Sequence, residues 1–263
     1  MKYTFFNKSG FNALLFAAVL LTTSCESELA EPTADAAKVA YVALHNFTLG
    51  DTTSVFVNNT RLALGGANVA LPVNVSLLGN YIGVNPGDVT VAARTIRGTA
   101  NYASRTVNVA QTTYTSFFTY DTLNSSGTAK MLVLTNNMKA ADTATSNIRF
   151  LHLSPTAGTI SVMLTRTSNQ FGQAAPGTPI SLSNIPYIGA TATPNEVTLS
   201  TFTNIPAGTY SVSVTSGSTT ILSVAALTVR EGKNYSVVAR GFAPPRTAPV
   251  PERLGVTLVL HNP

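Results

Sequence analysis

The sequence of 263 residues predicts an all-β protein built from antiparallel β-sandwich domains. Charged residues make up only 10% of it and hydrophobic residues 44%, so Thr, Ser and Asn must cover most of the solvent-facing surface. Short runs that alternate Val or Ile with these polar residues recur along the chain, and this is the period of a half-buried strand. Gly, Pro and Asn separate the runs. No run has helical periodicity, which favours a sandwich or a barrel.

The first 25 residues predict a secretory leader that is not part of the fold. Lys2 and Lys8 precede an entirely apolar run, residues 13–21, which is too short to span a bilayer as a helix. The segment Thr22-Thr23-Ser24 then leads into Cys25, the only cysteine of the chain. This arrangement resembles the lipobox of bacterial lipoproteins, in which the cysteine is acylated and becomes the mature N-terminus. Thr22 departs from that pattern, which prefers Leu at this place.

A lipid on Cys25 would make the membrane the first partner of the protein. Acyl chains at ~0.8 kcal/mol per buried methylene would hold it there essentially for good. The alternative is ordinary cleavage near Ser24, which leaves Cys25 as a free thiol. Residues 26–37 are acidic and small with one Pro, which predicts a flexible tether. By resemblance to Gram-negative lipoproteins, Glu26 implies sorting to the outer membrane, and the acidic residues beside the lipid resemble surface-export signals.

Two sandwich domains of the immunoglobulin-like or transthyretin-like kind are expected after the tether. The first covers residues 38–138 and the second residues 147–263, with a linker at 139–146. Strand-like runs and turns recur in the same order in both, which predicts an internal duplication. The stretch Ala40 to Asn46 opens the first copy, and Asn147 to Pro155 opens the second. On this alignment His45 and His152 occupy the same place.

Several segments of the second copy resemble a bacterial family of exported lipoproteins, the domain of unknown function DUF4397. The resemblance is carried by Arg149 to Pro155, Ile205 to Tyr210, Gly232 to Val238 and Leu258 to Asn262. It covers residues 147–263 well and residues 38–136 loosely. The family implies an all-β sandwich, often in tandem copies, with no established activity.

Two corners of the second copy are expected to be structural. Pro206 and Gly208 form a tight turn before Tyr210, and Gly232 repeats the device before Tyr235, because Gly adopts positive φ without a steric cost. A buried Tyr at such a corner usually gives its hydroxyl to a backbone carbonyl.

The two equivalent histidines are the strongest hint of chemistry. His152 shares a strand face with Ile148 and Phe150, so we interpret His45 and His152 as buried structural residues. A metal site needs three or four His, Cys or carboxylate ligands, and three histidines without a paired spacing do not provide them. A serine hydrolase signature and a nucleotide-binding glycine loop are also missing. The sequence therefore predicts neither a catalytic residue nor a metal or cofactor.

The best binding candidate is a long insertion in the second copy, residues 166–196. Loops of this length on a sandwich are usually functional or mobile. Phe171 and Tyr187 would be its contact residues, with an envelope glycan or protein as ligand, although the chain has no Trp for stacking on sugars. The arginines are scattered, which argues against a nucleic-acid partner.

These observations predict a non-enzymatic lipoprotein of the cell envelope that serves as a surface binding, adhesion or scaffold module. The alternatives are an envelope hydrolase that uses His152, or a carbohydrate-binding protein that uses the long loop.

Overall fold

The computed structural model describes residues 39–261 except 65, 77–80, 124–128, 140 and 246. The expected leader, Cys25 and the tether lie outside the described residues. The compact body to which the described residues belong runs from Lys38 to Pro263. In the described part of the chain, no helix has both the length and the apolar character needed to cross a bilayer.

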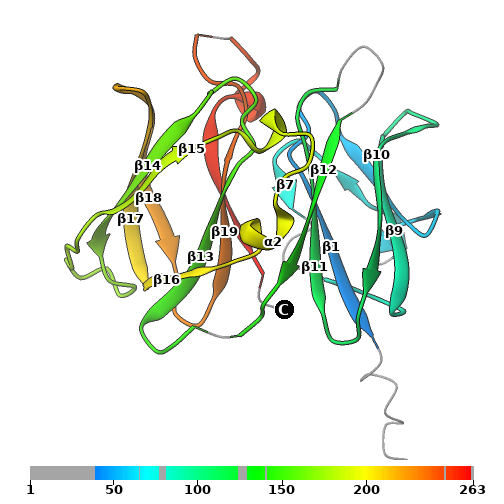
Figure 1. Ribbon diagram of the computed structural model, residues 1–263, viewed down its shortest axis with the longest axis horizontal. Helices are drawn as coiled ribbons and strands as arrows, with labels where there is room; N and C mark the ends of the chain where they lie inside the picture. Colours follow the sequence, from blue (N-terminus) through cyan, green and yellow to red (C-terminus); the bar gives the residue numbers. More distant parts are fainter. Residues whose placement is uncertain are drawn as a thin grey trace, which may run out of the picture. The chain divides into compact units, whose positions relative to one another are not determined.

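The first half of the body is a sandwich of two sheets (Figure 1). One sheet has the order β12 (Lys130–Asn136), β11 (Tyr114–Tyr120), β1 (Ala40–Asn46), β7 (Val75–Ser76), with β8 (Ile82–Val84) also on β1. The other has the order β10 (Asn101–Val109), β9 (Gly87–Thr95), β2 (Thr53–Val57), β3 (Thr60–Arg61), with β6 (Ala70–Leu71) also on β2. The short strands β4 (Ala63–Leu64) and β5 (Ala67–Asn68) pair with each other.

The second half repeats this plan with four strands in each sheet. One sheet has the order β16 (Thr203–Pro206), β13 (Thr145–His152), β19 (Asn234–Arg240), β20 (Gly255–Leu260). The other has the order β15 (Ile180–Ile185), β14 (Ile160–Ser168), β17 (Gly208–Ser216), β18 (Thr219–Val229). Helical structure in the described residues is limited to single turns: η3 (Ile188–Ala190), α2 (Glu196–Leu199) and η4 (Val250–Glu252). The predicted all-β sandwich fold is confirmed.

Two details of the strands differ from the sequence analysis. Most strand pairs are antiparallel, but β1 runs parallel to β11 and β13 runs parallel to β19. Parallel neighbours need a long crossover between them, and here the other sheet of the same sandwich supplies it. In addition, β13 begins at Thr145, so the last two residues of the expected linker belong to a strand.

The pairing register corrects the expected equivalence of the histidines. His45 lies opposite Phe118 and Leu151 lies opposite Val238. The following backbone bonds, Phe47 N to Thr119 O and Leu153 N to Ala239 O, continue the same alignment. His45 therefore matches Leu151, and His152 matches Asn46. The sequence alignment was off by one residue, and a one-residue shift places a side chain on the opposite face of a strand.

The corner before Tyr210 shows why its sequence is restrictive. A Cβ on Gly208 would lie 2.2 Å from the carbonyl oxygen of Ser168, so a side chain does not fit there. The buried Tyr210 donates its hydroxyl to the carbonyl of Pro206 at 2.6 Å. At the other corner Gly232 has a φ of 68°, and the buried Tyr235 hydroxyl accepts the Arg230 N–H at 3.3 Å.

Each sandwich has its own apolar core, and a third core is shared between them. The first core contains Val42, Val91 and Phe117, and the second contains Ile148, Val162 and Val237. The third core draws residues from the sheet β12-β11-β1 and from the sheet β13-β19-β20. We call the surface along which these two sheets pack the joint.

Candidate functional site at the joint

The joint is built by strands that are buried on both faces. Along β13, Ile148 packs into the core of the second sandwich, whereas Leu151 and Leu153 pack into the shared core. Side chains of a strand alternate between its faces, so one strand serves both cores. Phe118 and Leu132 meet them from the first sandwich. Because every one of these residues is at most 4% exposed, the joint is a dry, packed interface over this stretch.

A cluster of polar side chains interrupts the apolar joint. The Arg149 Nε donates to Ser236 Oγ at 2.6 Å, and Ser236 Oγ lies 2.7 Å from His261 Nε2. On the other side, His261 Nδ1 and His45 Nε2 lie 3.4 Å and 3.3 Å from Ser116 Oγ. All five residues are at most 4% exposed. We call them the joint polar cluster; it joins β1 and β11 of the first sandwich to β13, β19 and the residue after β20 in the second.

Arg149 carries a positive charge that no carboxylate among the described residues balances. Its Nη1 is buried without a hydrogen-bond partner. Burial lowers the pKa of Arg149 to about 9, which still leaves the guanidinium charged at neutral pH. Aromatic faces give partial compensation: the guanidinium carbon lies 4.7 Å from the ring centre of Phe202 and 5.8 Å from that of Phe118.

The two histidines of the cluster stay neutral beside this charge. Burial, followed by the positive charge of Arg149, lowers the pKa of His45 to about 3. Burial, Arg149 and His45 lower the pKa of His261 well below its usual value. Arg149 Nη2 lies 3.4 Å from His261 Nε2 and can only donate, so the partners assign the proton of His261 to Nδ1.

Asn136 and Tyr81 extend the cluster toward solvent. The Asn136 Nδ2 donates to Tyr81 Oη at 2.6 Å and to Ser116 Oγ at 2.8 Å. Tyr81 Oη also lies 3.0 Å from His261 Nδ1, and burial raises the pKa of Tyr81 to about 12. The Asn136 Oδ1 is buried without a hydrogen-bond partner. The cluster thus contains an unpartnered acceptor on Asn136 and an unpartnered donor on Arg149.

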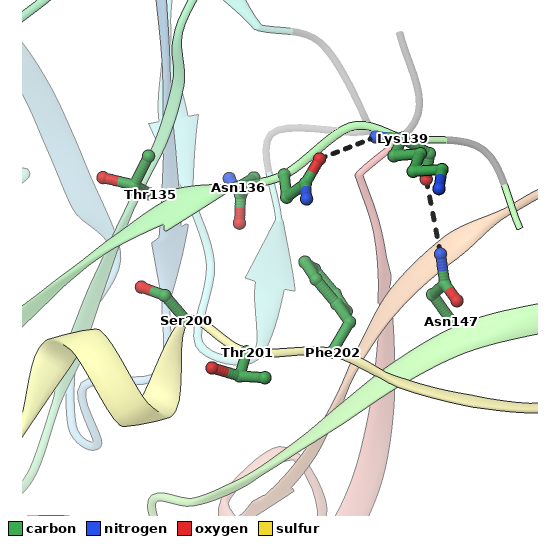
Figure 2. Close-up of a pocket in the computed structure, with 8 residues that line it drawn as sticks. Thr135, Asn136, Lys139, Asn147, Ser200, Thr201 and Phe202 are labelled. Atoms are coloured by element: carbon green, nitrogen blue, oxygen red, sulfur yellow. Dashed lines mark hydrogen bonds between the residues drawn. The ribbon is translucent and has the colours of Figure 1, made fainter.

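A cavity of about 460 Å³ opens beside this cluster (Figure 2). We call it the joint pocket; its lining residues are Thr135, Asn136, Asn137, Lys139, Asn147, Ser200, Thr201 and Phe202. Asn136 lies on one wall and Phe202 on the facing wall. The Lys139 backbone is fixed across the mouth, since its N–H donates to Asn137 Oδ1 at 3.0 Å and its carbonyl accepts from Asn147 Nδ2 at 3.3 Å. Both sandwiches therefore contribute to the pocket.

Phe202 separates the joint pocket from the buried charge. Ile148 pairs with Thr203 in the antiparallel β13–β16 ladder, which brings the preceding residue, Phe202, over Arg149. Its ring also makes an edge contact with His261, with the ring centres 6.0 Å apart. Phe202 is only partly buried and lies in the irregular stretch between α2 and β16.

The expected binding loop fastens the second sandwich to the first. Both carboxylate oxygens of Glu196 lie 3.2 Å from the Arg105 guanidinium, and Oε1 accepts the Val133 N–H at 3.0 Å. The Lys130 Nζ donates to the carbonyl of Gly189 at 2.6 Å. Segment 187–202, which contains α2, is therefore a clamp across the joint (Figure 1).

The two residues expected to form a binding surface have different surroundings. Phe171 is 79% exposed in a turn between β14 and β15, where its N–H donates to Asn169 Oδ1 at 2.9 Å. Tyr187 is half-buried and packs edge-on against Tyr120 and His152, with ring centres 6.3 Å and 5.9 Å apart. Burial and the charge of Asp121 raise its pKa. Tyr187 also lines a second, apolar cavity of about 310 Å³ together with Phe150, Ile185, Ile188 and Leu199.

His152 is engaged at both ring nitrogens. Its Nε2 donates to the carbonyl of Gly158 at 2.7 Å, and its Nδ1 accepts the Ser154 N–H at 3.3 Å. Burial lowers its pKa, although the bond to Gly158 acts in the opposite direction. A neutral ring with its proton on Nε2 has no lone pair left to accept a substrate proton.

The sequence analysis missed the residues that build the joint pocket. Arg149 was used only to recognise a family motif, and Asn136, Phe202 and Tyr81 were not singled out. One signal was present: Arg149 lies between apolar neighbours at a strand position whose face is buried, with no acidic residue nearby in the sequence. Among the described residues no group of three His, Cys, Asp or Glu side chains could hold a metal ion.

The chain matches a known protein family. The model of the domain of unknown function DUF4397 matches residues 29–163. The chain belongs to the DUF4397 family. The match covers the first sandwich and extends through β13 into β14, whereas the sequence analysis expected the stronger resemblance in the second copy.

Other comparisons add little to the DUF4397 assignment. No curated protein matches the chain. A solved structure described as a putative cell adhesion protein from Bacteroides ovatus is 12% identical and covers 84% of this chain and 95% of its own, with a TM-score of 0.26. A TM-score this low supports neither a shared function nor a shared arrangement in detail.

Proposed function

We propose that this DUF4397 protein is a lipid-anchored, non-enzymatic module of the outer membrane that binds a ligand at the joint between its two sandwiches. The observation that carries the proposal is the joint pocket, because both sandwiches and the clamp contribute its walls. A pocket of this size, with a few convergent polar groups, is typical of a ligand site. On this proposal the second sandwich is a second domain of the same family, and the clamp at 187–202 completes the site.

The anchor is supported by the sequence. A short apolar leader precedes the single cysteine, Cys25, and the acidic segment 26–37 separates it from the folded body. A lipid at Cys25 would leave the joint pocket free to meet ligands in the envelope. The mature N-terminus tests this directly by mass spectrometry of the membrane fraction. An unmodified N-terminus, or a Cys25→Ser variant that stays in the membrane, would contradict the anchor.

A binding role suits the state of the histidines better than hydrolysis does. His152 has both ring nitrogens in use, and His45 and His261 are buried in the joint polar cluster. A hydrolase would need one of them as a base that a substrate can reach. The rival enzyme would show itself as turnover of an ester or glycoside substrate that His152→Gln abolishes while the protein stays folded.

Capture of ligands from intact cells tests the binding role. The full-length protein, displayed on its own membrane, is crosslinked to neighbouring envelope components, and the same is done for a Phe202→Trp variant that narrows the joint pocket. We expect the variant to lose captured components. A Phe171→Ser variant is the matched control for the exposed turn. Equal capture by the wild type and by Phe202→Trp would remove the joint pocket from the proposal, and loss with Phe171→Ser would move the site to the turn.

A further inference from the structure

We infer that the joint pocket binds a hydroxylated carboxylate, whose carboxylate pairs with Arg149 and whose hydroxyl donates to Asn136. The inference rests on the proposed binding function and specifies the ligand class. Two sources carry this chemistry, a free hydroxy acid and a uronic acid residue of an acidic glycan, and the test below distinguishes them.

The buried charge of Arg149 is unbalanced among the described residues. A buried ion without a partner is strongly unfavourable, and a buried charged donor left without a hydrogen bond adds to the cost. Native proteins rarely retain such a group unless it has a use. Arg149 is 4% exposed, has an unpartnered Nη1 and is balanced by no carboxylate among the described residues. A water molecule could satisfy the N–H, but only an anion would also neutralise the charge.

The walls of the joint pocket also favour an anion. The joint pocket is lined by three Asn, one Lys, three hydroxyl residues and one Phe, with no acidic side chain among them. The Lys139 ammonium adds a second positive charge at the mouth. These walls disfavour a cation and supply donors to an anion.

The unpartnered acceptor on Asn136 requires a donor on the ligand. Asn136 is 4% exposed, and both hydrogens of its amide are used on Tyr81 and Ser116, which leaves Oδ1 as the free group. A ligand for this atom must bring a donor such as a hydroxyl. A simple carboxylate such as acetate brings none. The combination of one buried donor and one buried acceptor therefore selects a molecule with both groups.

Access to Arg149 requires movement of one ring. Phe202 lies over the guanidinium and forms a wall of the pocket, in an irregular stretch just before β16. Rotation of its side chain would open the way without disturbing the β13–β16 ladder, which begins at Thr203. Arg149 would then lose its cation–π contact with Phe202 and gain an ion pair with the ligand. This exchange is favourable in a partly desolvated site.

Calorimetric titration of the full chain tests the inference with four probes: glucuronate, lactate, glucose and acetate. We expect binding of glucuronate, weaker or no binding of lactate if the source is a glycan, and no binding of glucose or acetate. Lactate binding equal to that of glucuronate would favour a free hydroxy acid. A glucuronate-rich oligosaccharide, added in the same way, should bind at least as tightly as glucuronate if the source is a glycan.

Variants separate the site from general charge effects. Arg149→Met should weaken glucuronate binding about tenfold or more, the loss expected for a hydrogen bond to a charged group, and Asn136→Leu, which removes a neutral hydrogen bond, by about threefold to tenfold. Arg97→Met removes the same charge from an exposed turn that follows β9 and should change nothing. If Arg149→Met does not fold, Asn136→Leu and a Lys139→Glu change at the mouth carry the test, with circular dichroism and melting as checks.

The failure of this inference is distinguishable from failure of the proposed function. Glucuronate and lactate without measurable binding, or equal binding by Arg149→Met, would overturn the ligand class. The proposed function would survive that result if Phe202→Trp still abolished capture of envelope components on cells. It would fall only if the joint pocket played no part in capture.

Discussion

The two sandwiches share a frame, and they differ at the positions that face each other across the joint. Ser116 and Ser236 occupy equivalent places, and the pairing registers also match Ala43 with Arg149 and Asn136 with His261. A small apolar residue in one copy is a buried cation in the other. The clamp at 187–202, which begins inside the insertion 166–196, likewise belongs to the second sandwich alone. Two sandwiches with the same strand plan thus form a pocket through a few positions at which they differ, while the sheets themselves are alike.

Removing an apolar side chain from the joint should have the largest effect on stability. Leu151→Ala should lower the free energy of unfolding by about 2–5 kcal/mol, because a fully buried leucine leaves a cavity. Leu164→Ala, in the core of the second sandwich, is the matched control of equal chemistry. Urea unfolding followed by circular dichroism measures both. If the sandwiches behave as one body, each variant should shift a single transition.

Two separate transitions, with Leu151→Ala affecting neither strongly, would show that the joint contributes little. The second sandwich would then unfold independently of the first, as separate domains do.

The histidines of the joint polar cluster should make stability depend on pH. In the folded state the pKa of His45 is about 3 and that of His261 is also lowered, whereas an unfolded histidine titrates near 6.5. The unfolded chain therefore binds protons first. Stability is complete above about pH 6.5 and falls as the pH drops, by about 1.4 kcal/mol per pH unit for each neutral buried histidine.

Melting between pH 7 and pH 5.5 checks this slope, in a range where ordinary carboxylates remain largely ionised. His45→Leu gives the first sandwich the residue that the second has at this place, and it should reduce the slope. His152→Gln is a useful comparison, because its burial also lowers the pKa but on the opposite face of the sheet. An unchanged slope in His45→Leu would contradict the assignment of a neutral His45.

The same residues show which features of the structure could be predicted from the sequence. Alternation of Val or Ile with polar residues predicted the sandwich, and the Pro206 to Tyr210 corner could be predicted because its turn chemistry is local. The joint could not be predicted in the same way. It depends on which faces of distant strands meet, and no local pattern encodes that. A signal did exist in β13, where apolar residues occupy both faces from Ile148 to Leu153, a pattern typical of a sheet buried on both sides.

The candidate site was harder still to predict. Phe171 and Tyr187 were chosen because they are aromatic residues in a long loop, yet Tyr187 packs on the first sandwich. The one-residue error that aligned His45 with His152 also hid the contact between His45 and His261, whose ring centres lie 5.8 Å apart. Single histidines in two similar strands do not fix a register when the flanking residues differ.

Substitutions of Arg149 can make the two sandwiches alike at the position of the buried cation. Arg149→Ala places in the second sandwich the residue found at Ala43, and Arg149→Met keeps more of the volume. Replacing a buried ion by an apolar group of similar volume is often neutral or stabilising, by up to about 1–4 kcal/mol. We therefore expect Arg149→Met to unfold at equal or higher urea in the absence of ligand. A loss of several kcal/mol would mean that the contacts of Arg149 with Phe202, Phe118 and Ser236 outweigh its desolvation.

The smallest effect is expected at the clamp, which only the second copy possesses. Glu196 pairs with Arg105 at 3.2 Å, and the two side chains are 28% and 41% exposed. A pair this accessible is worth at most about 1 kcal/mol, and salt screens it. Glu196→Gln removes the charge but keeps an acceptor for the Val133 N–H, so it should cost a few tenths of a kcal/mol in urea unfolding. Glu196→Ala also removes that acceptor and should cost more. If the two variants lose the same stability, the backbone bond to Val133 contributes nothing, and the stability that Glu196 provides comes from its ion pair with Arg105.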